Sequence, residues 1–377
     1  MRILHTESST GWGGQENRTM NELITMRERG HDMAVLSRPG ARIIERAKEA
    51  GFQTFAVNMR GALDFPAIFK LRGVMKEFRP DVVNTHSGRD TQLAGMAARS
   101  LFGRPLIVRT RHLALPITSK FSYSVLPDHV VTVSNYVERY LVEAGVPGEQ
   151  ITTVSTGIDF TSYDRSLIAG DLREELGLSA SAQLIGTVAI MRGKKGHTDI
   201  LDAVPAVLER FPEAHFVFAG DGPQTANLIE RIKAEGLEKQ VHLLGLRRDV
   251  TNVLASLDVF VLPTHQEALG TAFIEAGAMA LPAVATNVDG VPEVVQDGYT
   301  GLLVPVKDGR AIAEAICQLL ADTSFRQRMG ANAAEFVRRK FSRGMAHGKF
   351  DRNSRFSCRR IFTKAQRGNY LRRWLSR

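Results

Sequence analysis

The 377-residue sequence has only two cysteines, Cys317 and Cys358. Two cysteines cannot form the disulfide framework of a small secreted domain, so we expect a reducing cytoplasmic setting. No apolar run approaches the roughly 18 residues that a membrane-spanning helix needs. Residues 1–5 have the pattern of a first strand rather than of a signal peptide. Membrane-spanning and disulfide-stabilised classes of protein are therefore disfavoured.

Metal-binding patterns are also missing. No Asp-x-Asp pair follows a predicted strand at a suitable position, and His and Cys do not occur at the spacings of a zinc site. We therefore expect no metal site and no cofactor. Cationic side chains and helix amides would take the role of a metal in stabilising negative charge.

The excess of basic residues is confined to the end of the chain. Eleven of the 49 Lys and Arg, but one of the 40 Asp and Glu, lie in residues 343–377, which leaves 38 bases and 39 acids in residues 1–342. Three interpretations of this basic tail stay open: contact with an anionic membrane surface, contact with nucleic acid, or a disordered or frameshifted end without selected function. No nucleic-acid-recognition module occurs, so we expect no nucleic-acid partner.

Short apolar runs alternate with helical periodicity, and this pattern restarts in the middle of the chain. The chain is long enough for two domains. We predict an α/β protein with two Rossmann-like, doubly wound domains at 1–165 and 166–342, a hinge region over 163–181, and the basic tail. Ligands of such sheets bind at the carboxyl ends of strands, so we expect the domains to face one central cleft. The predicted strands are 2–6, 32–37, 53–57, 82–85, 106–110, 130–133, 184–189, 215–219, 241–244, 259–262 and 283–285, and the predicted helices include 15–29, 65–78, 198–210, 224–235, 271–279, 309–320 and 324–341.

Two carboxylates follow the apolar run 259–263. Glu267 and Glu275 stand eight positions apart, with Glu267 in a predicted turn and Glu275 in the first turns of a predicted helix. The free amides of a helix N-terminus favour phosphate, and carboxylates accept hydrogen bonds from sugar hydroxyls. The stretch is therefore typical of a site for a sugar nucleotide.

Together with Gly277, the run 281–285 and residues 290–293, the stretch 267–275 resembles the E-x7-E motif of the family 4 retaining glycosyltransferases, which have the GT-B fold. The resemblance covers about residues 1–342. It implies a metal-independent retaining transferase that moves a sugar from a nucleoside-diphosphate sugar to a hydroxyl of a glycan or lipid-linked acceptor. Lipopolysaccharide or other cell-surface polysaccharide synthesis is the implied setting, in the cytoplasm or peripheral on the inner face of the cell membrane. Two alternatives are a GT-B sugar-nucleotide hydrolase or epimerase, and a non-catalytic nucleotide-sugar-binding protein.

The resemblance also assigns roles in the predicted donor domain. Glu267 is expected to bind the transferred sugar, and Lys195 and Arg192 to stabilise the departing diphosphate, with Lys194 as the competitor of Arg192. The family position for this Arg holds Ile190 here. The remaining donor-binding candidates are Glu275 for the ribose, Gly270 and Thr271 for phosphate, Arg248 beside the base, and Gly220 and Gly222 in a turn near the nucleotide.

The predicted first domain contributes a glycine-rich loop and a histidine. Gly13 and Gly14 follow the first strand and precede a helix, where a backbone without Cβ atoms can approach a diphosphate or sugar. His112 ends a predicted strand and matches a family histidine near the transferred sugar. His86 has a similar position after its own strand, and we expect it to line the cleft towards the acceptor.

Overall fold

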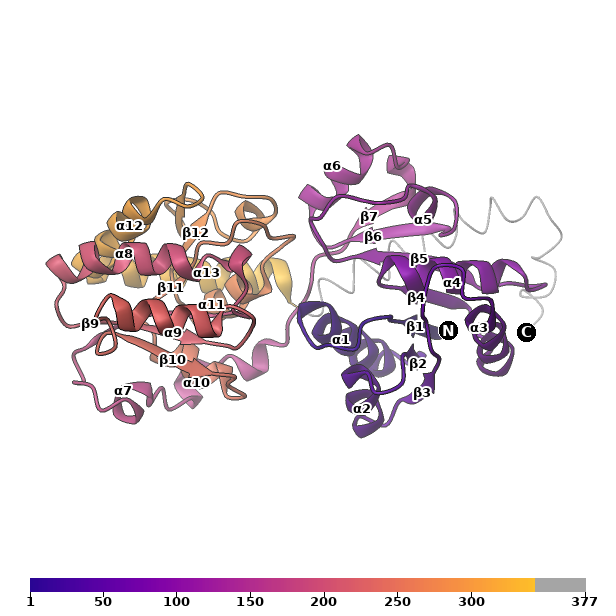
Figure 1. Ribbon diagram of the computed structural model, residues 1–377, viewed down its shortest axis with the longest axis horizontal. Helices are drawn as coiled ribbons and strands as arrows, with labels where there is room; N and C mark the ends of the chain where they lie inside the picture. The colour runs from indigo at the N-terminus through magenta and orange to yellow at the C-terminus, as the bar shows by residue number, and fades with distance from the viewer. Residues whose placement is uncertain (343–377) are drawn as a thin grey trace. The chain divides into compact units, whose positions relative to one another are not determined.

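The computed structural model describes residues 1–342, which form two compact units, Met1–Gly157 and Ile158–Ser342 (Figure 1). The predicted basic tail, 343–377, lies outside the described residues. Each unit is an α/β layer structure. Among the described residues, no helix is both long enough and apolar enough to cross a membrane.

The first unit is built on a parallel sheet of seven strands in the order β3-β2-β1-β4-β5-β6-β7. Helices α1 and α2 cover one face of this sheet, and α3 and α4 cover the other (Figure 1). The strands are β1 (Arg2–Thr6), β2 (Asp32–Ser37), β3 (Gln53–Ala56), β4 (Val82–Thr85), β5 (Leu106–Arg111), β6 (His129–Thr132) and β7 (Ile151–Thr153). The helices are α1 (Gly14–Glu28), α2 (Arg42–Glu49), α3 (Phe65–Phe78), α4 (Gly88–Arg99), α5 (Phe121–Ser124) and α6 (Asn135–Glu143).

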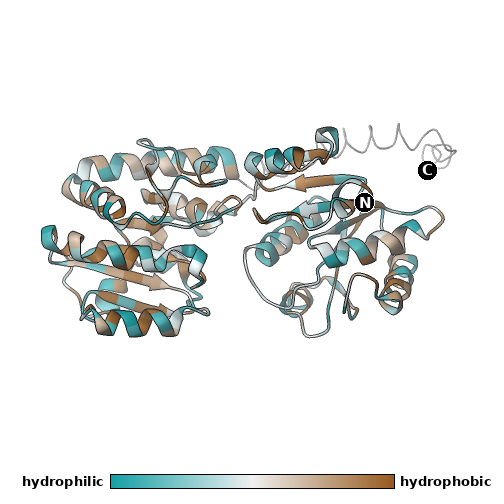
Figure 2. Cartoon of the chain, turned by 45° about the horizontal axis from the view of Figure 1, so that its top comes forward, coloured by the Kyte–Doolittle hydropathy of each residue, from teal (hydrophilic) through white to brown (hydrophobic). Residues whose placement is uncertain are grey.

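Alternation along β1 shows why the apolar runs are strands. Ile3 packs into the cluster under α1 and α2, whereas Leu4 packs into the cluster under α3 and α4. Successive side chains of a strand point to opposite faces, and both faces of this sheet are covered by helices. A strand in such a sheet is therefore apolar at nearly every position. Figure 2 shows this as brown colouring along the strands of each unit.

The second unit has a parallel sheet of six strands in the order β10-β9-β8-β11-β12-β13. Val259 and Val261 of β11 face the cluster under α8, α9 and α12, and Phe260 packs on Phe273 of α11, with ring centroids 5.7 Å apart. The strands are β8 (Gln183–Val188), β9 (Ala214–Ala219), β10 (Val241–Gly245), β11 (Val259–Leu262), β12 (Ala283–Thr286) and β13 (Gly301–Val304). The helices are α7 (Leu172–Glu175), α8 (His197–Arg210), α9 (Thr225–Ala234), α10 (Val250–Ser256), α11 (Thr271–Ala278), α12 (Gly309–Ala321) and α13 (Thr323–Phe341).

The prediction of two Rossmann-like, doubly wound domains is confirmed. Two strands were missed, β7 and β13. Each is three or four residues long and lies at the outer edge of its sheet. An edge strand this short has too few apolar residues to be distinguished from a loop by periodicity.

The units meet along the chain at Gly157 and Ile158, eight residues before the boundary that the sequence predicted. The segment 163–181, predicted as a hinge region, is fastened to the second unit. Arg165 donates hydrogen bonds to the carbonyl oxygens of Ala255 and Leu257 at 2.8 and 3.1 Å. Arg173 donates to Asp258 at 2.6 Å. These contacts are between residues far apart in sequence, so local pattern could not show them.

Candidate active site

Loops with charged side chains lie where the strand order of the second sheet reverses. From β8 the chain adds β9 and β10 on one side, and it then returns to place β11 directly beside β8. The loops that follow β8 and β11 therefore begin side by side at the carboxyl ends of these two strands, which is where such sheets bind ligands. Lys195 lies in the loop after β8, and Glu267 lies in the loop after β11.

Lys195 and Glu267 form an ion pair at this reversal point. The Lys195 Nζ donates to Glu267 Oε2 at 2.5 Å, and the two side chains are 17% and 18% exposed. The two loops are also joined through their backbones, because the carbonyl oxygen of Lys194 accepts from the His265 amide at 2.7 Å and from the Thr264 hydroxyl at 2.9 Å. A cation and a carboxylate are thus held side by side by two loops that are hydrogen-bonded to each other.

Gly196 makes this close approach of the loops possible. Its φ is +72°, in the left-handed region, and a Cβ there would lie 2.0 Å from the carbonyl oxygen of Pro263. No other residue fits between the two loops without moving the backbone. Gly196 is also the N-cap of α8 and directly follows Lys195. The position of Lys195 relative to β11 therefore depends on this glycine.

Helix α11 begins four residues after Glu267. Its N-cap is Gly270, with φ +90° and ψ +66°, and no side chain caps the helix. The first amides of a helix have no acceptor within the helix, and their dipoles sum to a positive potential at that end. Thr271, the first helical residue, is half-buried. The Lys195–Glu267 pair therefore has an anion-favouring helix start close to it along the chain.

Glu275 lies one turn further along α11 and is half-buried. Loss of water around its carboxyl group raises the pKa of Glu275 to about 7, and a hydrogen bond from Tyr163 opposes that shift. The same burial, with the charge of Glu275, raises the pKa of Tyr163, so Tyr163 stays a hydrogen-bond donor. Tyr163 was not predicted from the sequence, because it lies 112 positions from Glu275 and has no motif of its own.

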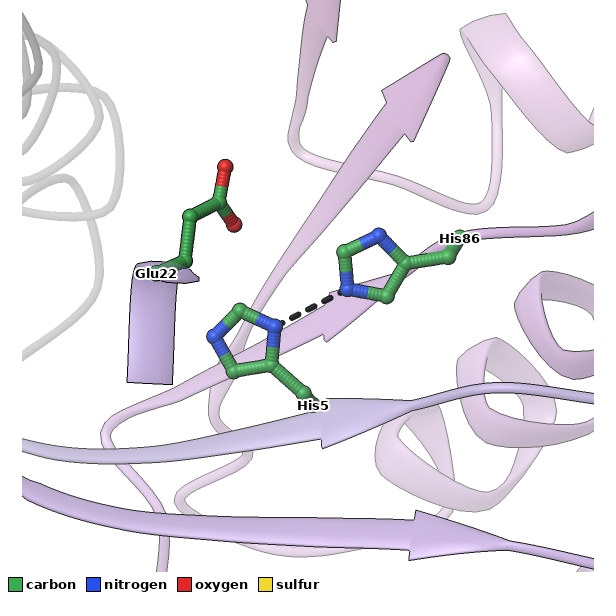
Figure 3. A group of neighbouring side chains, drawn as sticks. All are labelled: His5, Glu22 and His86. Carbon is green, nitrogen blue, oxygen red and sulfur yellow. Dashed lines mark hydrogen bonds between the residues drawn. The ribbon is translucent and has the colours of Figure 1, made fainter. Parts of the chain in front are cut away.

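The first unit has a row of three histidines at its own reversal point, where β1 and β4 are neighbours and β5 follows. His5 Nδ1 lies 2.9 Å from His86 Nε2, and His86 Nδ1 lies 2.9 Å from His112 Nε2. His5 and His86 are buried, and His112 is half-buried. Burial lowers the pKa of all three, so they are neutral near pH 7. Figure 3 shows the His5 and His86 rings meeting through their nitrogens, with Glu22 nearby.

His5, His86 and Glu22 have donor atoms within 4.8 Å of one another, which is close enough for a cation. The facing nitrogens of His5 and His86 are, however, hydrogen-bonded to each other. The Glu22 carboxylate pairs with Arg18 Nε at 2.8 Å. These donor atoms are therefore already hydrogen-bonded or ion-paired within the protein. Sequence spacing had not predicted the cluster, because its members come from β1, α1 and the end of β4.

Two buried carboxyl groups lie beside the histidine row. Asp90 accepts from the amides of His86 and Ser87, each at 2.8 Å, and from the Thr6 hydroxyl at 3.1 Å. Burial, and then the charge of Asp90, raise the pKa of Glu7 to about 8. Glu7 directly follows β1, and a polar residue at the carboxyl end of an apolar strand is the signal that could have found it.

Comparison with known proteins identifies the family. Residues 12–162 match Glycosyltransferase Family 4, and residues 170–336 match Glycosyl transferases group 1. Alpha-D-kanosaminyltransferase of Streptomyces kanamyceticus is 30% identical over 268 residues, 64% of this chain and 68% of that protein. This chain belongs to glycosyltransferase family 4. A second relative of this family 4 glycosyltransferase, the lipopolysaccharide core biosynthesis glycosyltransferase LpsE of Rhizobium meliloti, is 26% identical over 349 residues, covering 88% of this chain and 92% of LpsE.

Solved structures agree with the fold of this glycosyltransferase. Anabaena Alr3699/HepE, solved in complex with UDP-glucose, superposes with a TM-score of 0.82 at 20% identity, over 94% of this chain and 99% of that one. At this identity the likeness concerns the fold alone. The GT-B fold expected from the sequence is therefore confirmed.

The other predicted site residues of the glycosyltransferase fall into two groups. Arg192 and Arg248 are exposed, and among the described residues no hydrogen bond or ion pair joins the side chain of either to Lys195 or Glu267. The backbone of Arg192 does contact Lys195, because its carbonyl oxygen accepts from the Lys195 amide at 2.9 Å. Gly220 and Gly222 have a packing role, because a Cβ at either would lie 2.0 or 2.5 Å from a carbonyl oxygen of the loop after β8.

At the end of the glycine-rich loop of the first unit, Gly13 has a backbone conformation that any residue can adopt. Gly13 is the N-cap of α1 with an extended backbone (φ −166°), and Gly14 is the first residue of that helix. A Cβ at Gly13 would meet only Glu16 Oε2, at 3.6 Å, which is an ordinary contact. The structure therefore gives no packing reason for a glycine at position 13.

Proposed function

We propose that this family 4 glycosyltransferase is a retaining enzyme that transfers a sugar from a nucleoside-diphosphate sugar to a hydroxyl of a glycan or lipid-linked acceptor. The observation that carries the proposal is the ion pair of Lys195 and Glu267 at the strand-order reversal of the second unit, next to the uncapped start of α11. A cation, a carboxylate and helix amides are the groups that a sugar diphosphate requires. Cell-surface polysaccharide or lipopolysaccharide synthesis is the proposed setting, in line with the role named for LpsE.

In the proposed reaction the glycosidic bond to the diphosphate breaks as the sugar becomes oxocarbenium-like. Negative charge grows on the departing diphosphate, so a fixed cation stabilises the transition state more than the bound donor. Lys195 and the first amides of α11 supply that charge. Glu267 accepts hydrogen bonds from hydroxyls of the transferred sugar, and Glu275 accepts them from the ribose. Each charged hydrogen bond contributes roughly 1.5–3 kcal/mol.

Retention of configuration is part of the proposal. The acceptor hydroxyl attacks on the face from which the diphosphate leaves, and a diphosphate oxygen takes its proton. Product NMR that showed the opposite anomer would contradict this step. Charge stabilisation by Lys195 and helix amides also leads us to expect full activity in the presence of EDTA.

Calorimetry with UDP, GDP and ADP tests the donor site. We expect one nucleotide to bind, and we expect Lys195→Met and Glu275→Gln each to weaken binding by roughly 10- to 100-fold, since each removes one charged hydrogen bond. Lys239→Met is the matched control, because Lys239 is an exposed lysine of the same unit. Lys194→Met shows whether the loss of nucleotide affinity is specific to Lys195 or is shared by the neighbouring lysine.

Unchanged affinity in both Lys195→Met and Glu275→Gln, or no affinity for any nucleoside diphosphate, would overturn the proposal. The alternatives are separated by incubating the donor sugar nucleotide without acceptor. Rapid turnover under that condition would identify a hydrolase or epimerase. Nucleotide binding without turnover, when acceptor glycans and lipid-linked glycans are supplied, would identify a non-catalytic binding protein.

A further inference from the structure

The histidine row of the first unit has a defined hydrogen-bond direction. The ring centroids of His5 and His86 lie 5.1 Å apart, as do those of His86 and His112, whereas the facing nitrogens are 2.9 Å apart in each pair. The nitrogens are much closer than the ring centres, so the rings of each pair meet edge to edge, as Figure 3 shows for His5 and His86. Each contact is therefore a hydrogen bond in which one ring nitrogen donates and the other accepts.

A neutral imidazole carries one proton, on either Nδ1 or Nε2. Each gap in the row needs one proton, and this links the three tautomers. Either all three rings carry the proton on Nε2, or all three carry it on Nδ1. In the first arrangement the N–H bonds point from His112 towards His5, and His112 Nδ1 is an acceptor. In the second arrangement His112 Nδ1 is a donor.

Charges at the two ends of the row favour the first arrangement. The Glu22 carboxylate lies at the end of the row away from His112, with an oxygen within 4.8 Å of ring nitrogens of His5 and His86. Its negative charge favours N–H bonds that point towards that end of the row. At the other end, after burial, the charges of Arg18, Arg109 and Arg111 lower the pKa of His112, and positive charge there disfavours N–H bonds that point towards His112. Arg18 acts on all three rings, but it is paired with Glu22. An anion at one end and cations at the other polarise the N–H bonds towards His5.

We propose that His5 and His86, biased by Glu22, are positioning residues that hold His112 in the Nε2–H tautomer, so that His112 Nδ1 accepts a hydrogen bond from a hydroxyl of the bound substrate. His112 is the half-buried member of the row, and the other two are buried, so it is the one that a ligand can reach. His112 thus selects a ligand group that donates a hydrogen bond. The statement about substrate rests on the proposed function, whereas the statement about the tautomer does not.

Ring-nitrogen NMR of the full chain, labelled with 15N-histidine and treated with EDTA, tests the tautomer without substrate. Loss of one signal set in His112→Gln assigns His112. We expect its Nδ1 at the shift of a bare nitrogen and its Nε2 at that of a protonated one. In Glu22→Gln the bias is weakened, and the two shifts should move towards each other. Glu28→Gln is the matched control, since Glu28 is an exposed glutamate of the same helix.

Three NMR results would overturn the proposal. The first is a protonated Nδ1 on His112 in the unchanged protein. The second is a Glu22→Gln spectrum identical to that of Glu28→Gln. The third is a shift of the His5 and His86 nitrogens to metal-bound values on adding one equivalent of ZnCl2, because a metal would then replace the hydrogen bond between these rings.

Donor analogues test the consequence for the substrate. The series consists of analogues of the sugar nucleotide that binds best. In each analogue one hydroxyl of the sugar is replaced by hydrogen or by fluorine, and fluorine can accept a hydrogen bond but cannot donate one. At one position both replacements should weaken binding about tenfold, and His112→Ala should remove that loss. A fluorine analogue that binds like the hydroxyl parent at every position would overturn the proposal. Absence of any nucleotide binding would instead count against the proposed function, and the NMR result would be unaffected.

His86 variants test positioning separately from folding. Gln can both donate and accept, whereas Leu can do neither. We expect His86→Leu to lower kcat with little change in nucleotide affinity, and we expect His86→Gln to recover part of the loss. Equal kcat in the two variants would contradict a role through hydrogen bonding.

Discussion

At the scale of single residues, the candidate donor site already satisfies its own charges. Lys195 lies 2.5 Å from Glu267, and both side chains are largely buried. A buried ion pair is weak as a source of stability, because removing both groups from water offsets most of their attraction. A pair of this kind agrees with the ligand-binding role that we propose for it. A phosphate and a sugar hydroxyl can replace or share the partners without leaving either charge unpaired.

Glu275, which we propose binds the ribose, has a pKa that is raised mainly by burial. Its pKa of about 7, against an ordinary value of 4.5, leaves the carboxyl group partly protonated near neutral pH. The raised value means that the folded protein binds more protons than the unfolded chain between these two pH values. The contribution of Glu275 to the free energy of unfolding is therefore fully present below about pH 4.5, and it is lost as the pH rises through about 7.

The pH dependence of stability should change when Glu275 is replaced. Over the 2.5 pH units between 4.5 and about 7, the linked loss of unfolding free energy amounts to about 3 kcal/mol. We expect Glu275→Gln to lack this loss between pH 5 and pH 8, as measured by urea unfolding. Glu230→Gln, at an exposed glutamate of the same unit, is the control. Parallel pH profiles for Glu275→Gln and Glu230→Gln would contradict the prediction.

At the scale of elements, the start of α11 depends on one glycine. Gly270 adopts φ +90°, and a Cβ there would lie 2.5 Å from the ring of Phe273. That ring cannot move away cheaply, because it packs against Phe260 in the core. The helix start, and with it the direction of the amides proposed for phosphate, is therefore fixed by the absence of a side chain at this position.

Gly270→Ala should destabilise the second unit more than an equally strained control. Gly298 also has positive φ, +70°, but a Cβ there would meet nothing within 4 Å. Gly298→Ala should cost roughly 1–2 kcal/mol from backbone strain alone, and Gly270→Ala roughly 1–3 kcal/mol more from the clash. Thermal unfolding of the two variants measures both losses of stability. Equal losses in the two variants would show that Phe273 adapts freely.

At the scale of the whole molecule, the excess of basic residues lies outside the two folded units. Residues 1–342, which contain both Rossmann-like units, have 38 bases and 39 acids, whereas 343–377 has eleven bases and one acid. A nearly neutral body gives no broad attraction to an anionic surface, so long-range attraction to such a surface must come from the tail. Basic residues near an anionic membrane contribute roughly 1 kcal/mol each, and salt screens that contribution.

Deletion of 343–377 should therefore reduce binding to anionic vesicles. We expect sedimentation with phosphatidylserine-containing vesicles to fall for the truncated chain, and the difference to shrink at high salt. Binding to uncharged phosphatidylcholine vesicles is the control and should be equally low for both chains. Vesicle binding that is the same with and without the tail would dispose of a membrane role for it.

The strands β1, β2, β4 and β11 end where the apolar runs predicted, because burial on both faces of a parallel sheet marks the sequence at every position. β7 and β13 could not be found in this way, since they are short edge strands that depend on pairing with a neighbour. The boundary at Gly157 was likewise missed, because the contacts of Arg165 and Arg173 decide to which unit the connecting segment belongs.

The sequence alone determined the alternation of strands and helices, and its motifs pointed to Lys195, Glu267, Glu275 and His112. Only the tertiary structure paired Lys195 with Glu267 across 72 positions and His5 with His86 across 81. The physical reason is that periodicity records how a residue is buried within its own element. Which side chains meet is decided by strand order, which brings the ends of β1 and β4, or of β8 and β11, together from distant parts of the chain.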